Sequence, residues 1–352
     1  MSFTTLDTTD FVVSSDSITA PAWSSNQPTL STFFTASTTV TTQISAGAFY
    51  LDVYQTASNA NGAAVQFSVA YGNASGLGAP YYNALISGVT PSLSTYKQYK
   101  TLVYGSAVSG SQGFNFGGLN TNSRDVWAIN IDRNRYKESL FPGTFNITLS
   151  GSLGSIKLCD NSNDTSVISF LDCGRVFDIV SGSNGRAAAT TSTGQTAPGY
   201  TASGSYGLFL PDIGVIVLNP RALALPTASG GIGLVADEAV NPNTPYSSVS
   251  NTILYQAISG SANFQLNSQE TVSSNYVFVR IKNAEYNYTS NPTFVSGSGN
   301  LAFPSLVNNP QTFVTTVGLY NQNSELLAVG KMSKPLVKDF TKEALIRVKL
   351  DW

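Results

Sequence analysis

The residue types that most often carry catalysis are scarce in this sequence, and histidine is absent from all 352 positions. Without an imidazole there can be no Ser-His-Asp triad, no histidine-ligated metal and no histidine switch near neutral pH. The stretch closest to a hydrolase nucleophile elbow is 109–113, Ser-Gly-Ser-Gln-Gly, where Ser109 occupies the position that requires the first glycine. A glycosidase-type pair among the 20 acidic residues stays open, but no local cluster supports one. We therefore predict a protein that is not an enzyme and has no catalytic residues.

A metal site has one superficial candidate, the run of acidic and amide residues at 160–164. Asp160, Ser162 and Asp164 alternate like the first oxygen ligands of a calcium-binding loop. Thr165, however, stands where such a loop needs glycine, and Leu171 where it needs the distal glutamate. The run is therefore predicted to be a hydrophilic turn, and we expect neither a metal nor another cofactor.

The chain has two cysteines, Cys159 and Cys173, and its first residues bear on their redox state. Met1–Asp7 has neither the basic region nor the apolar core of a secretory signal, so we expect a chain that is not exported. Two reduced, partly buried thiols are then expected rather than a disulfide, which two neighbouring strands could otherwise form. No run of about 18 apolar residues exists, so we predict no transmembrane helix and no membrane partner.

The charges are few and unevenly distributed. Asp, Glu, Lys and Arg make up 11% of the chain, against roughly 25% in an average globular protein. The net charge of −2 argues against nucleic acid as a partner, because such a partner requires a basic surface. The first basic residue is Lys97, whereas the stretch after Gly330 is rich in bases. This polarity suits either a solvated surface on a small C-terminal domain or head-to-tail association of subunits.

Charged residues concentrate in Arg124-Asp125 and in the run 132–138, where both signs occur beside a tyrosine. Arginine and tyrosine are favoured in the centres of protein interfaces, so this run is a candidate contact surface. A solvated loop that follows a strand is the alternative. With the basic C-terminal strand, the predicted interface residues are Arg133, Arg135, Tyr136, Lys137, Lys342, Arg347 and Lys349.

Strand patterns recur along the chain, whereas long helical periodicity is scarce. Segments 49–54 and 64–71 alternate in polarity on either side of Asn61-Gly62, which predicts a tight β-hairpin. In the strand 126–131, Trp127, Ile129 and Ile131 are expected to share one face. Further strands are predicted at 145–149, 175–180 and 207–218, the last buried on both faces with Pro211 and Gly214 at an edge or bulge, and short helices near 221–225 and 253–258.

The C-terminal region is patterned more regularly, with strands predicted at 276–282, 312–320, 325–332 and 344–352. We therefore predict an all-β protein with three parts. Residues 1–35 form an extended N-terminal arm, which is either an ordinary edge strand or a segment lying on a neighbouring subunit. Residues 36–263 form a large β-sandwich-rich domain, which could comprise two subdomains and holds a long loop at 183–204. Residues 264–352 form a smaller β-sandwich domain.

Several segments resemble proteins of one family. Residues 309–321 and 325–335 resemble a hairpin of tailed-bacteriophage virion proteins, with a weaker likeness to the attachment domains of tail fibres. The ending 340–352 and the segments 131–138 and 176–185 are similar to structural proteins of contractile-tailed, cyanophage-type myoviruses. The resemblance implies a virion component of the tail, in the baseplate, neck or fibre-attachment region. It brings no catalytic residues with it.

These expectations combine into a non-enzymatic structural subunit that assembles through its β domains. Its partners would be other virion structural proteins and copies of itself in a ring, and it would be assembled in the host cytoplasm and reside in the virion. A capsid decoration protein is one alternative. A carbohydrate-binding, adhesin-like module is another, although Trp23, Trp127 and Trp352 are not clustered in the sequence.

Overall fold

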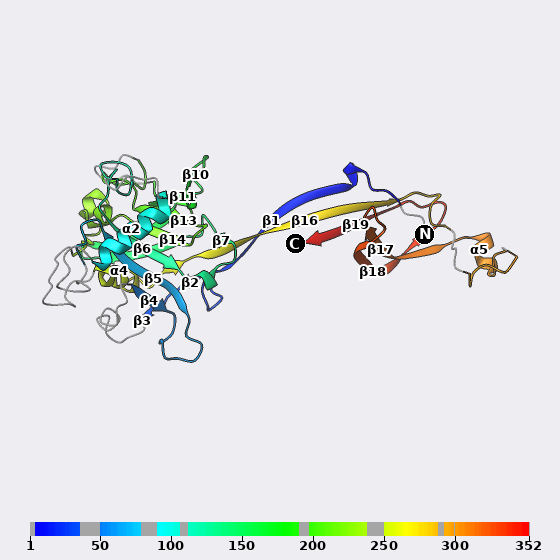
Figure 1. Cartoon of the computed structure of the whole chain (residues 1–352), viewed down its shortest axis with the longest axis horizontal. Coiled ribbons are helices and arrows are strands. Elements are labelled where there is room, and N and C mark those ends of the chain that lie inside the picture. Colours follow the sequence, from blue (N-terminus) through cyan, green and yellow to red (C-terminus); the bar gives the residue numbers. More distant parts are fainter. Residues whose placement is uncertain are drawn as a thin grey trace. The chain divides into compact units, whose positions relative to one another are not determined.

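The computed structural model describes residues 4–35, 50–78, 90–105, 112–189, 197–237, 250–287, 292–298 and 300–351. The chain divides into two compact units (Figure 1). The larger unit is Ile18–Glu270, and the terminal unit combines Met1–Ser17 with Thr271–Trp352. Residues 4–17 of the predicted arm therefore belong to the terminal unit and residues 18–35 to the larger one. Residues 264–270, predicted within the C-terminal domain, belong to the larger unit.

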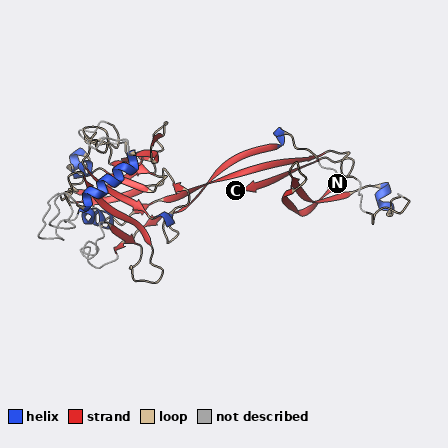
Figure 2. Ribbon diagram, viewed as in Figure 1, coloured by secondary structure: helices blue, strands red, loops and turns tan. Residues whose placement is uncertain are grey.

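The protein is all-β, as the sequence predicts, with 43% of its residues in strands and 14% in helices (Figure 2). The strands of the larger unit are β2 (Thr29–Leu30), β3 (Phe34–Thr35), β4 (Leu51–Tyr54), β5 (Val65–Asn73), β6 (Asp125–Ile131), β7 (Ser139–Leu140), β8 (Asn146–Gly151), β9 (Gly154–Asp160), β10 (Ser169–Leu171), β11 (Gly174–Ser183), β12 (Arg186–Ala187), β13 (Gly207–Leu210), β14 (Val215–Leu218) and β15 (Phe264–Gln265). Most of them form one 13-stranded sheet in the order β2-β15-β8-β9-β11-β13-β14-β6-β5-β4-β3, with β10 and β12 each paired to β11.

Both faces of this sheet are covered, because alternate residues of its central strands enter two separate apolar cores. Trp127, Ile129 and Ile131 share the main core, which confirms the predicted face, and α4 (Ser250–Ser259) adds Leu254 and Ile258 to it. The second core holds Val126, Val215 and Val217, with Tyr96 and Val103 from α2 (Pro91–Tyr104). One helix thus covers each face of the sheet. Because the central strands are buried on both faces, their residues are mostly apolar.

The β13–β14 hairpin shows this burial most clearly, since all eight of its strand residues are buried. The predicted double burial of 207–218 is confirmed. The placement of Pro211 and Gly214 at an edge or bulge was wrong, because both residues lie in the turn that joins the two strands. Gly214 has φ +69°, and a Cβ there would lie 2.6 Å from the Tyr136 hydroxyl, so the turn needs glycine.

The predicted hairpin of 49–54 and 64–71 is also present, as β4 and β5 paired from Leu51↔Val69 to Tyr54↔Val65. The prediction of a tight turn at Asn61-Gly62 was wrong, because a longer connection, residues 55–64, joins the two strands. A bulge between Val53 and Tyr54 shifts the register near this connection, which a longer loop accommodates more easily than a two-residue turn.

Both predicted short helices are confirmed, as α3 (Pro220–Ala224) and α4. The sequence patterns missed α2, because serine, threonine and lysine interrupt its apolar positions. Its start is nevertheless encoded, since the Thr90 hydroxyl caps the helix by accepting from the backbone N–H of Leu93, and Pro91 occupies the first turn.

Asn219 begins α3 and joins three segments of the larger unit. Its amide nitrogen donates to the carbonyl oxygens of Ser203 and Ser205 at 2.9 and 2.8 Å. Its amide oxygen accepts from the backbone N–H groups of Arg221 and Ala222 and from the side chain of Asn120. This fully buried side chain therefore fixes the helix start against the loop that precedes β13.

Part of the predicted long loop at 183–204 is ordered into a second small hairpin. Asn184 and Gly185 adopt φ +55° and +74°, which lets β12 pair back onto β11 through Ser183↔Arg186. Thr201 and Gly204 form an antiparallel bridge at the other end of the segment, and residues 190–196 lie outside the described residues.

The terminal unit contains the short helices η1 (Thr8–Asp10) and α5 (Pro304–Asn308) with two sheets. Its strands are β17 (Thr312–Tyr320), β18 (Leu326–Lys338), β19 (Ala344–Asp351) and most of β1 (Phe11–Pro21) and β16 (Asn267–Ile281). Residues 18–21 of β1 and 267–270 of β16 belong to the larger unit. One sheet has the order β1-β16-β19, so β1 is an edge strand of the chain's own sheet, and β17 and β18 form a separate hairpin. The predicted C-terminal strands are confirmed, and Trp352 lies outside the described residues.

Candidate functional site

Four of the predicted interface residues lie in one short segment of the larger unit. Asp132 caps the 3₁₀ helix η2 (Arg133–Arg135), and Tyr136 follows it. The Arg133 guanidinium donates to the Tyr136 carbonyl at 2.7 Å and lies 4.6 Å from the centre of its ring. Arg133 and Lys137 are exposed, whereas Tyr136 is only 7% exposed and belongs to the main core, where burial raises its pKa. This geometry offers two cations to a partner and uses the tyrosine for packing.

Arg135 differs from the other cations of this segment because it is half-buried. Its Nε is buried without a hydrogen-bond partner in the described part of the chain. An unsatisfied donor of this kind costs about 1–3 kcal/mol, and a contact that supplied an acceptor would recover that free energy.

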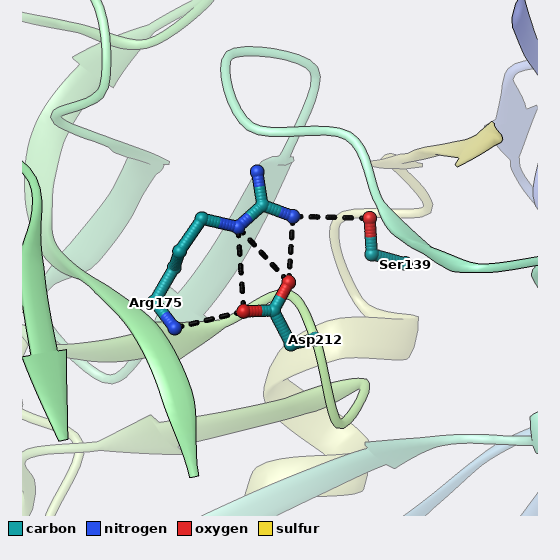
Figure 3. Close-up of polar contacts among 3 residues, drawn as sticks. All are labelled: Ser139, Arg175 and Asp212. Atoms are coloured by element: carbon teal, nitrogen blue, oxygen red, sulfur yellow. Dashed lines mark hydrogen bonds and ion pairs between the residues drawn. The ribbon is translucent and has the colours of Figure 1, made fainter. Parts of the chain in front are cut away.

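A cluster of Arg175, Asp212 and Ser139 attaches the turn of the β13–β14 hairpin to β11 and β7. Figure 3 shows the Arg175 guanidinium facing the Asp212 carboxylate, with Nη2–Oδ1 and Nε–Oδ1 distances of 2.6 and 2.9 Å. The Arg175 backbone N–H also donates to Asp212 Oδ2 at 2.8 Å, and Nη2 donates to the Ser139 hydroxyl at 3.1 Å. These contacts join β11, β7 and the turn, so the cluster stabilises the fold beside the η2 segment.

The three remaining predicted interface residues belong to the terminal unit. Lys342 pairs with Asp339 at 3.1 Å, and Lys349 pairs with Asp351 at 3.0 Å. Arg347 and Lys349 lie on the exposed face of β19, at 5.4 and 5.9 Å from the ring centre of Tyr276. The structure thus groups Arg347 with Lys349, while Lys342 lies in the turn that precedes β19.

These ion pairs shift the pKa values of their members so that the charged forms are favoured. The Thr341 hydroxyl and the Lys342 ammonium donate to Asp339 and hold its pKa at about 2. The hydrogen bond to Asp351 raises the pKa of Lys349. Lys349 and Asp351 are both exposed, so their pair contributes little to stability, whereas Lys342 is exposed and its partner Asp339 is buried. The two lysines remain accessible to a partner.

The feature that sequence reasoning missed is the apolar surface of the terminal unit. Among the described residues of this unit only Val277 and Ile281 are buried apolar side chains, whereas the larger unit buries 46. Fourteen large apolar side chains of the terminal unit are exposed: Leu6, Phe11, Val12, Val13, Tyr286, Phe303, Val307, Phe313, Tyr320, Leu326, Leu327, Val329, Phe340 and Leu345. Exposed apolar side chains in this number make the terminal unit a candidate interaction surface.

One part of this surface is well defined by strand register. Tyr320 pairs with Leu326 and Gly318 pairs with Val329, which places these side chains on one face of the β17–β18 hairpin. Their exposed fractions are 40% for Tyr320, 53% for Leu326 and 57% for Val329, and we name these three residues the hairpin face. The adjacent pair Leu326-Leu327 breaks the two-residue alternation and is the sequence signal that could have revealed it.

The terminal unit contains a buried cation, Lys338, that has no acidic partner among the residues the structure describes. Lys338 is fully buried, and its ammonium donates to the carbonyl oxygens of Asn283 and Asp339 and to the side-chain oxygen of Asn287, at 2.8–2.9 Å. All three donors are satisfied, so Lys338 ties the end of β18 to the segment after β16.

Two further predictions concern the cysteines and the 160–164 run. Cys159 and Cys173 are free thiols, as predicted, and burial raises the pKa of Cys159 to about 12. The 160–164 run is the predicted turn, in which the Asp160 carboxylate accepts the N–H groups of Gly143 and Ser162. No group of three or more Cys, Asp or Glu residues that could hold a metal ion occurs in the described ranges.

Comparison with known proteins adds no relative: no family model, no curated protein and no solved structure matches this chain. Within the described residues, no helix is both long enough and apolar enough to cross a membrane.

Proposed function

We propose that this chain is a non-enzymatic structural subunit of a tailed-phage virion, which assembles through its β domains in the tail, at the baseplate, neck or fibre-attachment region. The exposed apolar surface of the terminal unit is the observation that carries the assembly role. The resemblance of segments 131–138, 176–185, 309–321, 325–335 and 340–352 to virion proteins supports the location.

The free energy available from covering the terminal unit is large for a unit of its size. A large apolar side chain gains about 1.5–3 kcal/mol on full burial, so side chains exposed by 40–68% have roughly 1 kcal/mol each still to gain. The hairpin face and the exposed Phe11, Val12 and Val13 of β1 would together supply several kcal/mol on burial. This driving force favours an obligate or long-lived contact over a transient one.

Charge does not oppose association between copies of the terminal unit. Its sequence contains eight basic and eight acidic residues, so two copies meet without net repulsion. Arg347 and Lys349, which are exposed on β19, offer charged contacts to acidic groups of another copy. A homo-oligomer, in a ring, with other virion proteins as further partners is the assembly that this surface fits. A capsid decoration protein would use the same surface at another position in the particle.

Sedimentation velocity of the full chain over a wide concentration range tests the assembly role. We expect oligomers, and we expect the double variant Leu326→Ser with Val329→Ser to shift the distribution toward monomer. The matched control is Leu119→Ser with Phe170→Ser, which removes two even more exposed apolar side chains from the larger unit and should leave the oligomer intact.

Mass spectrometry and cryo-EM of intact particles test the location. The chain should be detected in tail-containing particles and should trace into a ring. A chain that stays monomeric at every concentration and is absent from particles would refute the proposal.

A further inference from the structure

Both outer edges of the sheet β1-β16-β19 are open to a further strand. β1 and β19 are the two ends of its order, and each pairs with β16 alone among the described strands. β17 and β18 form a separate sheet, so neither of them extends this one. An open edge presents backbone N–H and C=O groups with which a strand of another chain can pair.

β1 lacks the features by which an edge strand normally avoids pairing with other chains. It spans 11 residues, carries no Lys or Arg, and has its only proline at its last position, Pro21. Nine of its residues are exposed, and Phe11, Val12 and Val13 place apolar side chains on both of its faces. β18, in contrast, carries Pro335 and three lysines. β1 is therefore well suited to join the sheet of another chain.

Charge distinguishes the edges that could receive β1. The only charged residue of β1 is Asp16, whereas β19 carries Arg347 and Lys349 besides Asp351. Two β1 strands would bring two Asp16 carboxylates into one ladder, and two β19 strands would bring two pairs of bases together. β17 has no charge that could match Asp16. A β1–β19 pair between copies is the combination that brings opposite charges together.

The two strands run in the same direction, which determines how copies could pair. β1 enters the larger unit at Ile18, and β16 leaves that unit after Glu270, so these paired strands are antiparallel (Figure 1). β19 is antiparallel to β16 as well. Copies related by rotation about an axis along the strands would therefore present β1 to β19 in parallel. Such head-to-tail contacts generate a ring or a filament.

Asp16 and Lys349 act on one another within a single chain, across β16. The hydrogen bond to Asp351 is the main cause that raises the pKa of Lys349, and the Asp16 carboxylate adds to it from two strands away. This interaction indicates that both side chains lie on one face of the sheet. Neighbouring strands are about 4.8 Å apart, so Asp16 of a second copy, on the outer edge of β19, would lie one strand spacing from Lys349 instead of two.

We propose, as a contact that rests on the assembly role proposed above, that β1 of a second copy adds in parallel to the outer edge of β19, with its Asp16 beside Lys349. In this register, two-residue steps place Val12 of the second copy beside Leu345 on the same face. Val12 and Leu345 are 47% and 61% exposed in a single copy. The register that pairs the charges therefore also covers exposed apolar side chains.

Disulfide trapping in the full chain tests this pairing. The background is Cys173→Ser, and Cys159 stays because it is buried. We expect a mixture of Val12→Cys chains and Leu345→Cys chains to form a covalent dimer on mild oxidation, because adjacent strands bring Cα atoms within the range of about 4.4–6.8 Å that a disulfide requires. The matched control is Leu327→Cys on β18, which is 68% exposed and should give no cross-link with Val12→Cys.

The other outcomes distinguish this pairing from its alternatives. A cross-link within Val12→Cys chains alone would indicate β1–β1 pairing, and one within Leu345→Cys chains alone would indicate β19–β19 pairing. Either result, or a cross-link to Leu327→Cys, would overturn the proposal. An oligomeric parent chain whose Val12→Cys and Leu345→Cys variants do not cross-link would overturn it and leave the assembly role intact. A parent chain that is monomeric in sedimentation velocity would overturn both.

Charge reversal gives an independent readout of the same contact. Asp16→Lys and Lys349→Glu should each weaken self-association at least about tenfold, and an equimolar mixture of the two should recover it. Mixing cannot repair the contact within either chain, so recovery identifies a contact between copies. Lys334→Glu makes the same change of charge at an exposed position of β18 and should associate as the parent does. Single variants that associate normally, or a mixture that does not recover, would contradict the proposed register.

Discussion

The ion pair between Arg175 and Asp212 yields the most quantitative prediction, because one of its contacts is independent of the arginine side chain. Asp212 accepts from Nε and Nη2 of Arg175 but also from the Arg175 backbone N–H. The change Asp212→Ala removes all of these bonds, whereas Arg175→Met leaves the backbone bond in place. The two single variants should therefore differ in their cost.

The magnitude follows from the partial burial of the pair. Its side chains are 25% and 32% exposed, between a surface pair worth about 0–1 kcal/mol and a buried pair whose truncation costs about 3–5 kcal/mol. We expect Asp212→Ala to lower the free energy of unfolding of the larger unit by about 2 kcal/mol and Arg175→Met by about 1 kcal/mol. The double variant should cost about 1 kcal/mol less than the two combined, since the side-chain bonds are lost only once.

Urea unfolding monitored by tryptophan fluorescence measures this cycle. Trp23 and Trp127 are both buried in the larger unit, and a Trp352→Phe background restricts the signal to them. The coupling should weaken in 1 M NaCl, where the screening length falls to about 3 Å, but should not vanish because the bonds are short. A coupling below about 0.3 kcal/mol would refute the reasoning, because it would mean that the two side chains stabilise the hairpin turn independently.

Three further predictions concern buried polar groups. Asn219→Ala should destabilise the larger unit by about 2–3 kcal/mol in the same urea assay, because it removes a helix cap and takes the donor from the buried Ser205 carbonyl and the part-buried Ser203 carbonyl. A cost below about 0.5 kcal/mol would contradict that role. Lys338→Met should cost about 3 kcal/mol, because three hydrogen bonds of a buried ammonium are lost and the Asn287 side-chain oxygen loses its donor. Faster proteolysis of the terminal unit would report this loss, with the exposed Lys334→Met as the control. Because the pKa of Asp178 is raised above 3.8, the folded state retains its proton longer than the unfolded state does, and the carboxyl group loses stabilising effect as pH rises between 3.8 and its folded pKa. Asp178→Asn cannot ionise, so its stability relative to the parent chain should increase as pH rises through this window. A relative stability that falls instead would show that a partner stabilises the carboxylate.

Local pattern predicted strands well where one face is buried. The alternation of Trp127, Ile129 and Ile131 identified a core face, and the continuous apolar run at 207–218 identified strands covered on both sides. Pattern failed where tertiary contacts override local preference. The Asn61-Gly62 pair indicated a tight turn, yet the bulge after Val53 and the longer connection determine the hairpin, and α2 forms because its few apolar residues meet the second core.

The candidate sites were harder to predict than the fold. Tyr136 was chosen as an interface residue from its type and its charged neighbours, but those features do not reveal that Gly214 leaves room for its ring in the core. Asp178 and Tyr200 lie 22 residues apart and have no shared motif. Only the tertiary structure brings them into hydrogen-bond contact, at 3.1 Å.

The sequence by itself determined the all-β class, the lack of histidine chemistry and the positions of most strands, because these depend on composition and on a two-residue period that each segment carries alone. The tertiary structure decided which apolar residues are buried and which carboxylates lack a partner. Burial and desolvation depend on neighbours distant in the chain. The Leu326-Leu327 pair marks an irregular strand in the sequence, but only the hairpin register places Leu326 and Val329 together on an exposed face.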